Sequence, residues 1–309
     1  MMRRLSSVLA LFSLAGVAHA EVPSVVTDIP PVQSLVAAVM GDLGTPEVLA
    51  GGGADAHSYQ LRPSQARALA NAGLVFWVGH EMTPWLERAL EAGSSGEVVA
   101  LLGSGGSKVR EFSAAEMAAE HADAEHSNGG ADHDHGSTDP HGWLDPDNAR
   151  AWLGVIRDGL AKADPEHADV YAANAAAADA SIAATDAEIK AALVGAAGAK
   201  IVMGHDAYGY FADHFGLTIA ATVEAGDAAE PGAAHLEELR QMLKSEAVRC
   251  MFPEAGGDPE RYVWLAEGTG TKVGTPLDPE GRMLAEGPGL YEQLLTDIGT
   301  AVADCLAGT

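Results

Sequence analysis

An alanine-rich stretch in the middle of the chain, residues 164–193, limits what this sequence can fold into more than any other feature. Alanine favours helix strongly, and the few apolar side chains of the stretch recur on one helical face. We predict that Asp164 caps this helix, that Pro165 occupies its first turn and that Gly195 follows its end. A stiff helix of roughly 30 residues would extend about 45 Å, enough to join two lobes, although a long helix inside a single domain would look the same.

Short β-branched runs alternate with longer helical stretches on both sides of this segment. The strand-like runs cover residues 74–78, 98–102, 200–203, 217–223, 249–252 and 271–273. Such alternation is typical of parallel sheets covered by helices. The sequence therefore predicts an α/β fold.

The N-terminus has the three parts of a secretory signal peptide. Two arginines precede an apolar run over residues 5–17, and the Ala-His-Ala at 18–20 offers a cleavage site. A membrane anchor or a buried helix is the alternative, but the run is short for a bilayer and ends in small residues. We therefore expect export of the protein and removal of residues 1–20 by cleavage after Ala20.

The chain is strongly acidic, with 18 basic and 44 acidic residues and a formal net charge of −26. Loss of the two arginines with the signal peptide would take the net charge to −28. A surface of this sign repels nucleic acid and anionic lipid headgroups, and it attracts cations. The composition therefore argues against nucleic acid as a partner.

The chain contains two cysteines, Cys250 in a strand-like run and Cys305 in a helix-like run near the C-terminus. In an oxidising compartment we expect them to form one disulfide that ties the last helix to the C-terminal sheet. A thiolate metal site is the alternative. It is disfavoured because neither cysteine has another Cys or a His at ligand spacing.

Residues 116–139 are rich in His, Asp, Glu, Gly and Ser and contain almost no large apolar side chain. Because such a segment cannot bury a core, we predict a mobile loop. Its imidazoles could form an auxiliary, weaker zinc site that collects metal and passes it inward; they are His121, His126, His133 and His135. A solvated surface insertion is the alternative, but four imidazoles in so short a segment favour the metal role.

Four other positions lie in predicted loops next to strands or helices, the kind of place where α/β folds bind ligands. They are His57, His141, His205 and Asp278. Three imidazoles and one oxygen form a tetrahedral shell that Zn²⁺ accepts readily. A single His is more often a surface or hydrogen-bonded residue than a ligand, and spacing alone does not show that these four converge.

Five sequence strings resemble those of the periplasmic metal-binding proteins that serve zinc and manganese ABC importers. They are HSYQLRPS from residue 57, WVGHEM from 77, DPHGWLDP from 139, GHDAYGYF from 204 and LDPEG from 277. The resemblance extends over nearly the whole mature chain. It is greatest to the zinc-specific ZnuA type, which also has a His/Asp-rich loop and a Cys pair in the C-terminal half.

The resemblance implies two Rossmann-like α/β lobes with parallel sheets, joined by one long rigid helix, with the metal in the cleft between the lobes. On this sequence we assign residues 21–160 to the N-terminal lobe, with 116–139 as its His-rich loop. Residues 161–197 would then form the connecting helix and 198–309 the C-terminal lobe.

The family's metal ligands carry over to individual positions of this chain. His57 and His141 would be ligands from the N-terminal lobe, and His205 from the C-terminal lobe. Asp278 matches the family's carboxylate position, which varies among zinc-specific members and can be taken by water or another carboxylate. Ala56 stands where some relatives have an acidic residue, so no carboxylate can act from that position here.

Each ligating imidazole also needs an acceptor for its other ring N–H, and Asp145, Asp206 and Glu254 are available in the sequence. The remaining histidines of the folded segments have no ligand-spaced partners, and we expect structural roles for them: His80, His167, His214 and His235.

The resemblance implies a high-affinity periplasmic zinc-binding protein, not an enzyme, that delivers Zn²⁺ to the membrane permease of an ABC importer. We expect a monomer, with a periplasmic metallochaperone as a further candidate partner. A manganese carrier of the same fold is the first alternative. Mn²⁺ prefers oxygen ligands and would call for a second carboxylate in place of one imidazole, so three histidines favour zinc.

A secreted zinc hydrolase is the second alternative. His133, His135, Asp139 and His141 faintly resemble the H-x-H-x-D-H arrangement of metallo-β-lactamases, but the spacing is wrong. A hydrolase also needs an open coordination position and a general base beside the metal-bound water. A shell filled by three histidines and a carboxylate would suppress that chemistry.

Overall fold

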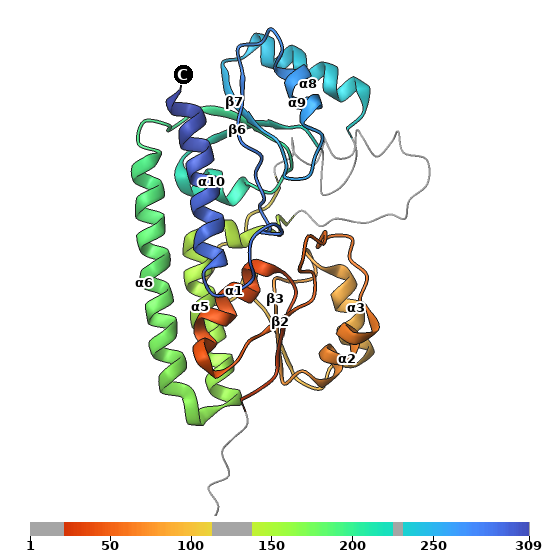
Figure 1. The fold of residues 1–309 in the computed structure, drawn as a ribbon, viewed down its shortest axis with the longest axis vertical. Helices are drawn as coiled ribbons and strands as arrows, with labels where there is room; N and C mark the ends of the chain where they lie inside the picture. The colour runs from red at the N-terminus through yellow and green to blue at the C-terminus, as the bar shows by residue number, and fades with distance from the viewer. Residues whose placement is uncertain (1–21, 113–137, 225–230, 309) are drawn as a thin grey trace, which may run out of the picture.

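The computed structural model describes residues 22–112, 138–224 and 231–308. The predicted signal peptide and the four histidines of the His-rich loop lie outside these described residues. Two parallel sheets stand at opposite ends of the molecule, and two long helices run beside both of them (Figure 1). Among the described residues, no helix is long and apolar enough to cross a membrane.

The first sheet has the strand order β2-β1-β3-β4, with all neighbouring strands parallel. Its strands are β1 (Val25–Thr27), β2 (Glu47–Val48), β3 (Leu74–Trp77) and β4 (Glu97–Ala100). The helices around it are α1 (Pro30–Met40), α2 (Pro63–Asn71), α3 (Pro84–Gly93) and α5 (Pro146–Ala163). Each of these helices has proline in its first turn, where the missing N–H costs nothing. This sheet and these helices are called the N-lobe below.

The second sheet has the order β6-β5-β7-β8, again parallel throughout. Its strands are β5 (Lys200–Met203), β6 (Thr218–Thr222), β7 (Val248–Phe252) and β8 (Lys272–Val273). With the helices α7 (Gly209–Phe215), α8 (Ala233–Ser245) and α9 (Pro259–Ala266) it forms the C-lobe. The two sheets repeat one strand order, and the predicted α/β fold with two parallel-sheet lobes is confirmed.

The predicted long helix is confirmed as α6 (Ala168–Ala192), preceded by the short 3-10 helix η3 (Pro165–His167). It begins later than the sequence suggested, and Asp164 does not cap it. The buried Asp164 carboxylate instead accepts a hydrogen bond from the Tyr171 hydroxyl at 2.8 Å and lies 2.7 Å from His167 Nδ1. Both contacts involve Oδ2, and Oδ1 is buried without a hydrogen-bond partner among the described residues.

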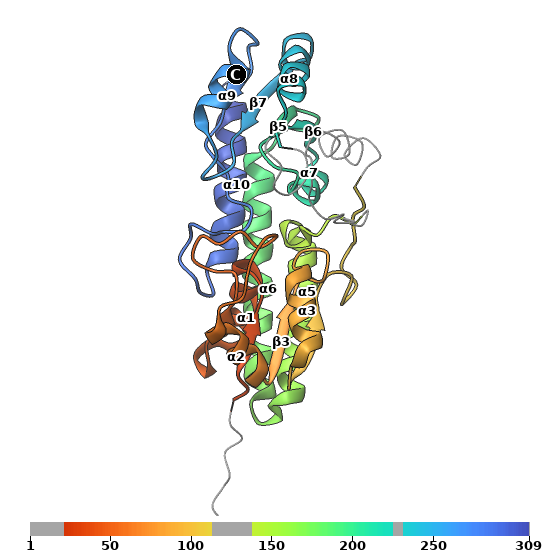
Figure 2. The same ribbon diagram turned by 90° about the vertical axis from the view of Figure 1, so that its right-hand side faces the viewer.

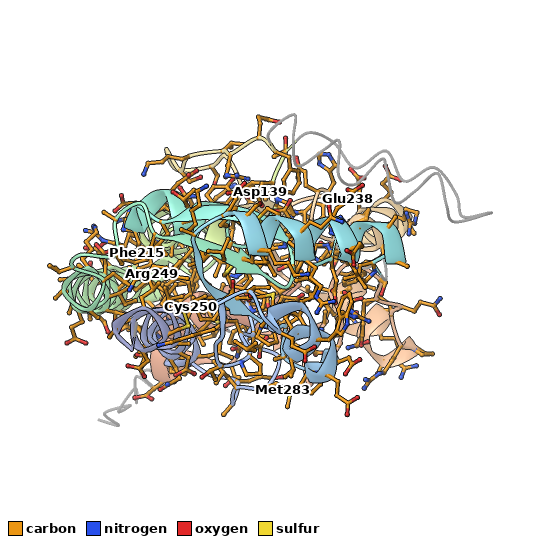
Figure 3. All side chains as sticks on the ribbon, turned by 90° about the horizontal axis from the view of Figure 1, so that it is seen from above. Asp139, Phe215, Glu238, Arg249, Cys250 and Met283 are labelled. Carbon is orange, nitrogen blue, oxygen red and sulfur yellow. A yellow bond between two sulfur atoms is a disulfide. The ribbon has the colours of Figure 1, made fainter. Side chains whose placement is uncertain are left out.

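A second long helix, α10 (Leu290–Ala307), runs beside α6 and also reaches both lobes (Figure 2). Near its start, Tyr291 N donates to Ser34 Oγ of α1 at 3.0 Å. Near its end, Cys305 forms a disulfide with Cys250 of β7, which lies beside α10 in Figure 3. The predicted disulfide is therefore confirmed, and the thiolate metal site is excluded.

The buried apolar side chains form one main core and one small cluster. The main core is continuous through the N-lobe, α6, α10 and the inner side of the C-lobe. The small cluster lies on the outer side of the C-lobe, between its sheet and helices α8 and α9, and consists of Val202, Val223, Leu239, Leu243, Val248, Met251, Tyr262 and Leu265. Loops that follow β2 and β5 meet between the lobes, where the candidate ligands lie.

Candidate metal centre

His57 lies in the loop between β2 and α2, and the surrounding backbone is fixed on two sides. Its own N–H donates to Asp55 Oδ1 at 2.9 Å. The carbonyl of Ala56 accepts a hydrogen bond from Trp85 Nε1 at 2.6 Å. Since the indole of Trp85 is buried, the partly buried His57 is presented from an anchored loop.

His141 immediately precedes the 3-10 helix η2 (Gly142–Leu144) and is completely buried. Asp139 Oδ1 accepts from His141 N at 3.0 Å and lies 2.9 Å from His141 Nδ1. The other Asp139 oxygen lies 3.0 Å from Arg110 Nη1. A carboxylate at Nδ1 fixes the proton on that nitrogen, which directs the lone pair of Nε2 toward a metal. Asp139 was not among the acceptors that we expected.

His205 follows β5 and is also buried. Its Nδ1 lies 4.0 Å from Glu254 Oε1, so the expected acceptor Glu254 is close but beyond hydrogen-bond distance. Glu254 Oε1 also accepts from Arg282 Nη2 at 3.3 Å. Burial raises the pKa of Glu254 to about 7, although the positive charges of His205 and Arg282 oppose this rise.

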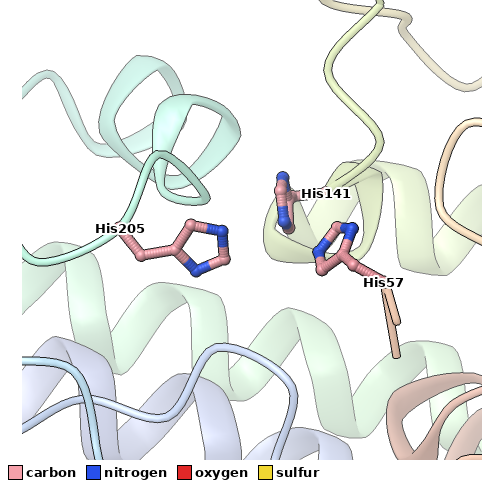
Figure 4. Close-up of side chains that lie close together, drawn as sticks. All are labelled: His57, His141 and His205. Carbon is pink, nitrogen blue, oxygen red and sulfur yellow. The ribbon is translucent and has the colours of Figure 1, made fainter. Parts of the chain in front are cut away.

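The structure brings the three predicted histidines together from both lobes (Figure 4). One ring nitrogen from each of His57, His141 and His205 lies within 4.8 Å of the others. Their ring centroids are 5.2 to 5.9 Å apart. In a tetrahedral zinc site with Zn–N bonds of about 2.0–2.1 Å, the ligand nitrogens are about 3.4 Å apart. The rings fit such a shell after an inward shift on the order of 1 Å.

Asp278, the fourth predicted ligand, is not in this group of three. Its Oδ2 accepts from Met283 N at 2.8 Å, and its Oδ1 lies 3.9 Å from Arg282 Nε. This Oδ1 is buried and has no hydrogen-bond partner among the described residues, so only one of the two Asp278 oxygens is hydrogen-bonded within its own loop.

A polar network connects the segment that holds His141 to helix α7, which closely follows His205. The Tyr210 hydroxyl accepts from Arg110 N at 2.7 Å and donates to Asp139 O at 3.2 Å. A Cβ at Gly209 would lie 2.4 Å from the guanidinium carbon of Arg110, so a larger residue there would have to displace the Arg110 side chain. The two halves of the site are thus held in register by direct contacts between the lobes.

A second cluster of acidic and imidazole groups lies between the lobes, around His214 of α7. His214 Nδ1 lies 2.9 Å from Asp145 Oδ1, and its Nε2 lies 2.8 Å from Asp186 Oδ1 of α6. Lys108 Nζ lies 3.2 Å from the second oxygen of Asp145. Because both ring nitrogens contact carboxylates and a lysine supplies the remaining positive charge, this cluster acts as a charged contact between lobes.

Burial alone would lower the pKa of His214, but its hydrogen bonds with Asp145 and Asp186 outweigh that effect and raise the pKa above 6.5. Nothing in the sequence near His214 indicates this cluster, because its partners come from α5 and α6. Asp145, which we expected to be available as an acceptor for a metal-binding imidazole, instead serves His214.

The family model for the zinc-uptake complex component A periplasmic, ZnuA, matches residues 25–305. The chain belongs to the ZnuA family. A curated ZnuA, the high-affinity zinc uptake system protein of Paracoccus denitrificans, is 48% identical over 312 residues and 96% of each chain. The resemblance predicted from the five sequence strings is therefore confirmed.

Solved structures of proteins with different bound metals share the ZnuA fold of this chain. The manganese complex of the solute-binding protein FpvC from Pseudomonas aeruginosa has a TM-score of 0.77 and 21% identity, covering 93% of this chain and 99% of that one. Zinc-bound AdcA from Streptococcus pneumoniae has a TM-score of 0.70 and 22% identity, covering 91% of this chain and 58% of that one. At these identities the likeness establishes the fold, so the choice of metal depends on the ligands of this chain.

Proposed function

We propose that this protein binds Zn²⁺ with high affinity in the periplasm and delivers it to the membrane permease of an ABC importer. The observation that supports this most is the convergence of three histidines from both lobes in a chain of the zinc-uptake family. Zn²⁺ is the cargo, and because its ligands are divided between two lobes, its binding stabilises the contact between them.

We propose His57, His141 and His205 as the imidazole ligands, with a carboxylate from the loop at residues 278–280 in the fourth place. Asp139 holds His141 in the tautomer that binds metal through Nε2. Three nitrogen donors with one oxygen favour Zn²⁺ over Mn²⁺, which prefers more oxygen ligands. The same filled shell leaves no open position for a hydrolytic water, so we expect a carrier without turnover.

The remaining expectations from the sequence extend this proposal. The mature chain would start after the cleavage site at Ala20 and act as a monomer. His121, His126, His133 and His135 would form the auxiliary site, from which metal passes inward, and a periplasmic metallochaperone would be a further partner.

Zinc titration of the mature protein against a competing chelator tests the main site. We expect His57→Ala, His141→Ala and His205→Ala each to weaken binding by more than about 100-fold, since loss of an outer partner alone costs about 10–100-fold. His80→Ala is the matched control, because its side chain is 63% exposed and lies outside the group of three. Tight binding by all three variants, or a preference for Mn²⁺ in competition, would contradict the proposal.

A further inference from the structure

Arg110 lies in the segment between β4 and η2 and contacts the carboxylate that supports His141. Its Nη1 donates to Asp139 Oδ2 at 3.0 Å, while the other Asp139 oxygen faces the backbone and the ring of His141. The Asp139 side chain is completely buried, and that of Arg110 is 19% exposed. The two oxygens of one carboxylate are therefore divided between a candidate zinc ligand and a guanidinium.

This division lets Arg110 determine the direction of the Asp139 carboxylate. A carboxylate held at one oxygen can rotate about its Cβ–Cγ bond, whereas charge-assisted hydrogen bonds at both oxygens fix the plane of the group. Loss of the guanidinium would also leave a buried acidic oxygen without this donor, which is costly in a protein interior. The carboxylate would then reorient, and the His141 ring would lose its alignment.

The backbone of Arg110 is itself fixed, so that its side chain starts from a defined place. Arg110 O accepts from Asp139 N at 2.9 Å, and Arg110 N donates to the Tyr210 hydroxyl at 2.7 Å. The next residue, Glu111, forms an antiparallel bridge with Thr138. Arg110 and Asp139 are thus joined through their backbones as well as through their side chains.

The same guanidinium also contacts the C-lobe. Its Nε lies 3.4 Å from Asp213 Oδ2 of α7, and the backbone of Gly209 packs against its central carbon so closely that a Cβ would not fit. Helix α7 begins four residues after His205. Because a guanidinium is planar and rigid, a shift of α7 would move it relative to Asp139. Arg110 therefore connects the residue that aligns one ligand to the helix that follows another.

We propose that Arg110 is a positioning residue of the zinc site, which holds Asp139 against His141 and makes this alignment depend on the docking of α7. The inference rests on the proposed function. It adds no ligand, because a guanidinium has only hydrogen-bond donors and acts here through Asp139. Displacement of α7 would loosen His141 as well as His205, so the affinity for the ion would fall on both sides of the seam together.

Zinc titration of the mature protein against a chelator tests this role with Arg110→Ala, Asp139→Asn and the double variant. We expect Arg110→Ala to weaken Zn²⁺ binding by about tenfold, the lower end of the loss for outer partners of metal ligands. Because Arg110 acts through Asp139, the double variant should bind within about twofold of Asp139→Asn alone, whereas independent contributions would multiply. Arg150→Ala is the matched control, since this guanidinium pairs with Asp179 and takes no part in the group of three histidines.

A second pair of variants tests the connection to the C-lobe. Gly209→Ala should weaken Zn²⁺ binding in the otherwise unchanged protein, because its methyl group would displace the Arg110 side chain. The same change should have little effect once Arg110→Ala has removed that side chain. A loss that persists beside Arg110→Ala would overturn the connection, since Gly209 would then act on His205 directly. The absence of a loss in either background would overturn it too.

The ring proton of His141 provides a readout that a merely structural role would not move. In zinc-loaded protein with ¹⁵N-labelled histidine, we expect the His141 Nδ1–H proton to exchange slowly in nuclear magnetic resonance spectra, because a buried carboxylate holds it. Arg110→Ala should speed this exchange while the ring signals of His57 remain, since a looser hydrogen bond gives less protection. An unchanged His141 signal in a variant with weakened binding would overturn the assignment.

Wild-type Zn²⁺ affinity in Arg110→Ala would also overturn it, as would a loss in the double variant equal to the product of the two single losses. If circular dichroism shows that Arg110→Ala does not fold, Arg110→Gln keeps part of the side-chain volume without the charge and should weaken binding in the same way. Unchanged affinity in Arg110→Gln would then refute the role.

His141→Ala separates this inference from the proposed function. If His141→Ala loses tight Zn²⁺ binding while Arg110→Ala keeps wild-type affinity, Arg110 has no positioning role but the zinc site stands. If His141→Ala retains tight binding, the proposed function itself fails.

Discussion

The N-lobe and the C-lobe repeat one strand order, yet they are stabilised differently. The central strands of the N-lobe sheet, β1 and β3, lie inside the main hydrophobic core, and both histidines of this lobe are fixed by hydrogen bonds next to them in the chain. The outer side of the C-lobe has its own small cluster of eight buried residues, and a disulfide ties its sheet to α10. A common topology therefore does not imply a common source of stability. One lobe presents prearranged imidazoles, and the other presents one imidazole and several carboxylates.

Removal of the disulfide should have the largest effect and should act through the C-lobe. Cys250 and Cys305 are separated by 55 residues, and closing a loop of that length stabilises a fold by about 4 kcal/mol in the chain-entropy description. We expect the double variant Cys250→Ser, Cys305→Ser to lose about that much free energy of unfolding in urea. Hydrogen exchange should rise mainly in β7 and α10. Equal rises in the N-lobe sheet would contradict the distinction between the lobes.

Replacing His214 should weaken the contact between the lobes in a pH-dependent manner. The raised pKa of His214 means that its contribution is complete below pH 6.5 and is lost as the pH rises through the folded-state value. We expect His214→Gln to cost about 1.5–3 kcal/mol at pH 6, as for hydrogen bonds to charged groups, and less at pH 9. The pKa of Asp145 is lowered, so its own contribution is lost only in acid.

Urea unfolding of wild type and His214→Gln at the two pH values measures this difference. The charged groups around the ring are Asp145, Asp147, Asp186 and Lys108, with Lys190 paired to the far oxygen of Asp186. A difference that grows between pH 6 and pH 9 would show that the neutral ring, and not the charged one, makes the contact.

Replacing Asp139 should weaken zinc binding without removing a ligand. The carboxylate holds both the backbone and the ring of His141, and such partners typically contribute about 10–100-fold to metal affinity. We expect Asp139→Asn to lose Zn²⁺ affinity within that range in a chelator competition. Asp179→Asn is a control, because Asp179 pairs with Arg150 on the exposed surface. Unchanged affinity in Asp139→Asn would mean that packing alone orients His141.

The smallest effect is expected at the surface of the N-lobe. Lys162 of α5 and Glu97 of β4 form an ion pair at 2.8 Å, but their side chains are 70% and 44% exposed. Exposed pairs contribute about 0–1 kcal/mol, so Glu97→Gln should lower the free energy of unfolding by less than about 1 kcal/mol. The His214 pair with Asp145, whose side chains are 5% and 4% exposed, should exceed it. Equal losses would show that burial does not distinguish the two contacts.

The main fold could be predicted because its signals are local. All six predicted strand-like runs form β3 to β8 with ends within two residues, and the alanine-rich stretch forms α6. The strands β1 and β2 were missed because they contain only three and two residues. Such short strands are defined by pairing with distant neighbours, and a sequence pattern needs more residues to show a period of two.

The candidate site was predictable in its imidazoles but not in its supporting groups. His57, His141 and His205 stood in specific motifs, whereas the cluster around His214 depends on contacts between segments far apart in the chain. Asp139 was within reach of sequence reasoning, since an Asp two residues before a His can accept from both its backbone and its ring. The carboxylates that we expected as acceptors were chosen for their chemical type alone, because the sequence does not give their distances from the imidazoles.

The pair of helices α6 and α10 has a consequence for how the ion leaves. Both helices cross the seam, and α6 contains neither Pro nor Gly at which it could kink. A wide swing of one lobe away from the other would have to bend two helices at once and pull α10 from α1. Release should therefore proceed by local rearrangement of the ligand-bearing loops. The importer would then extract the ion by displacing short segments, and the residence time of the metal would follow the opening rate of those segments.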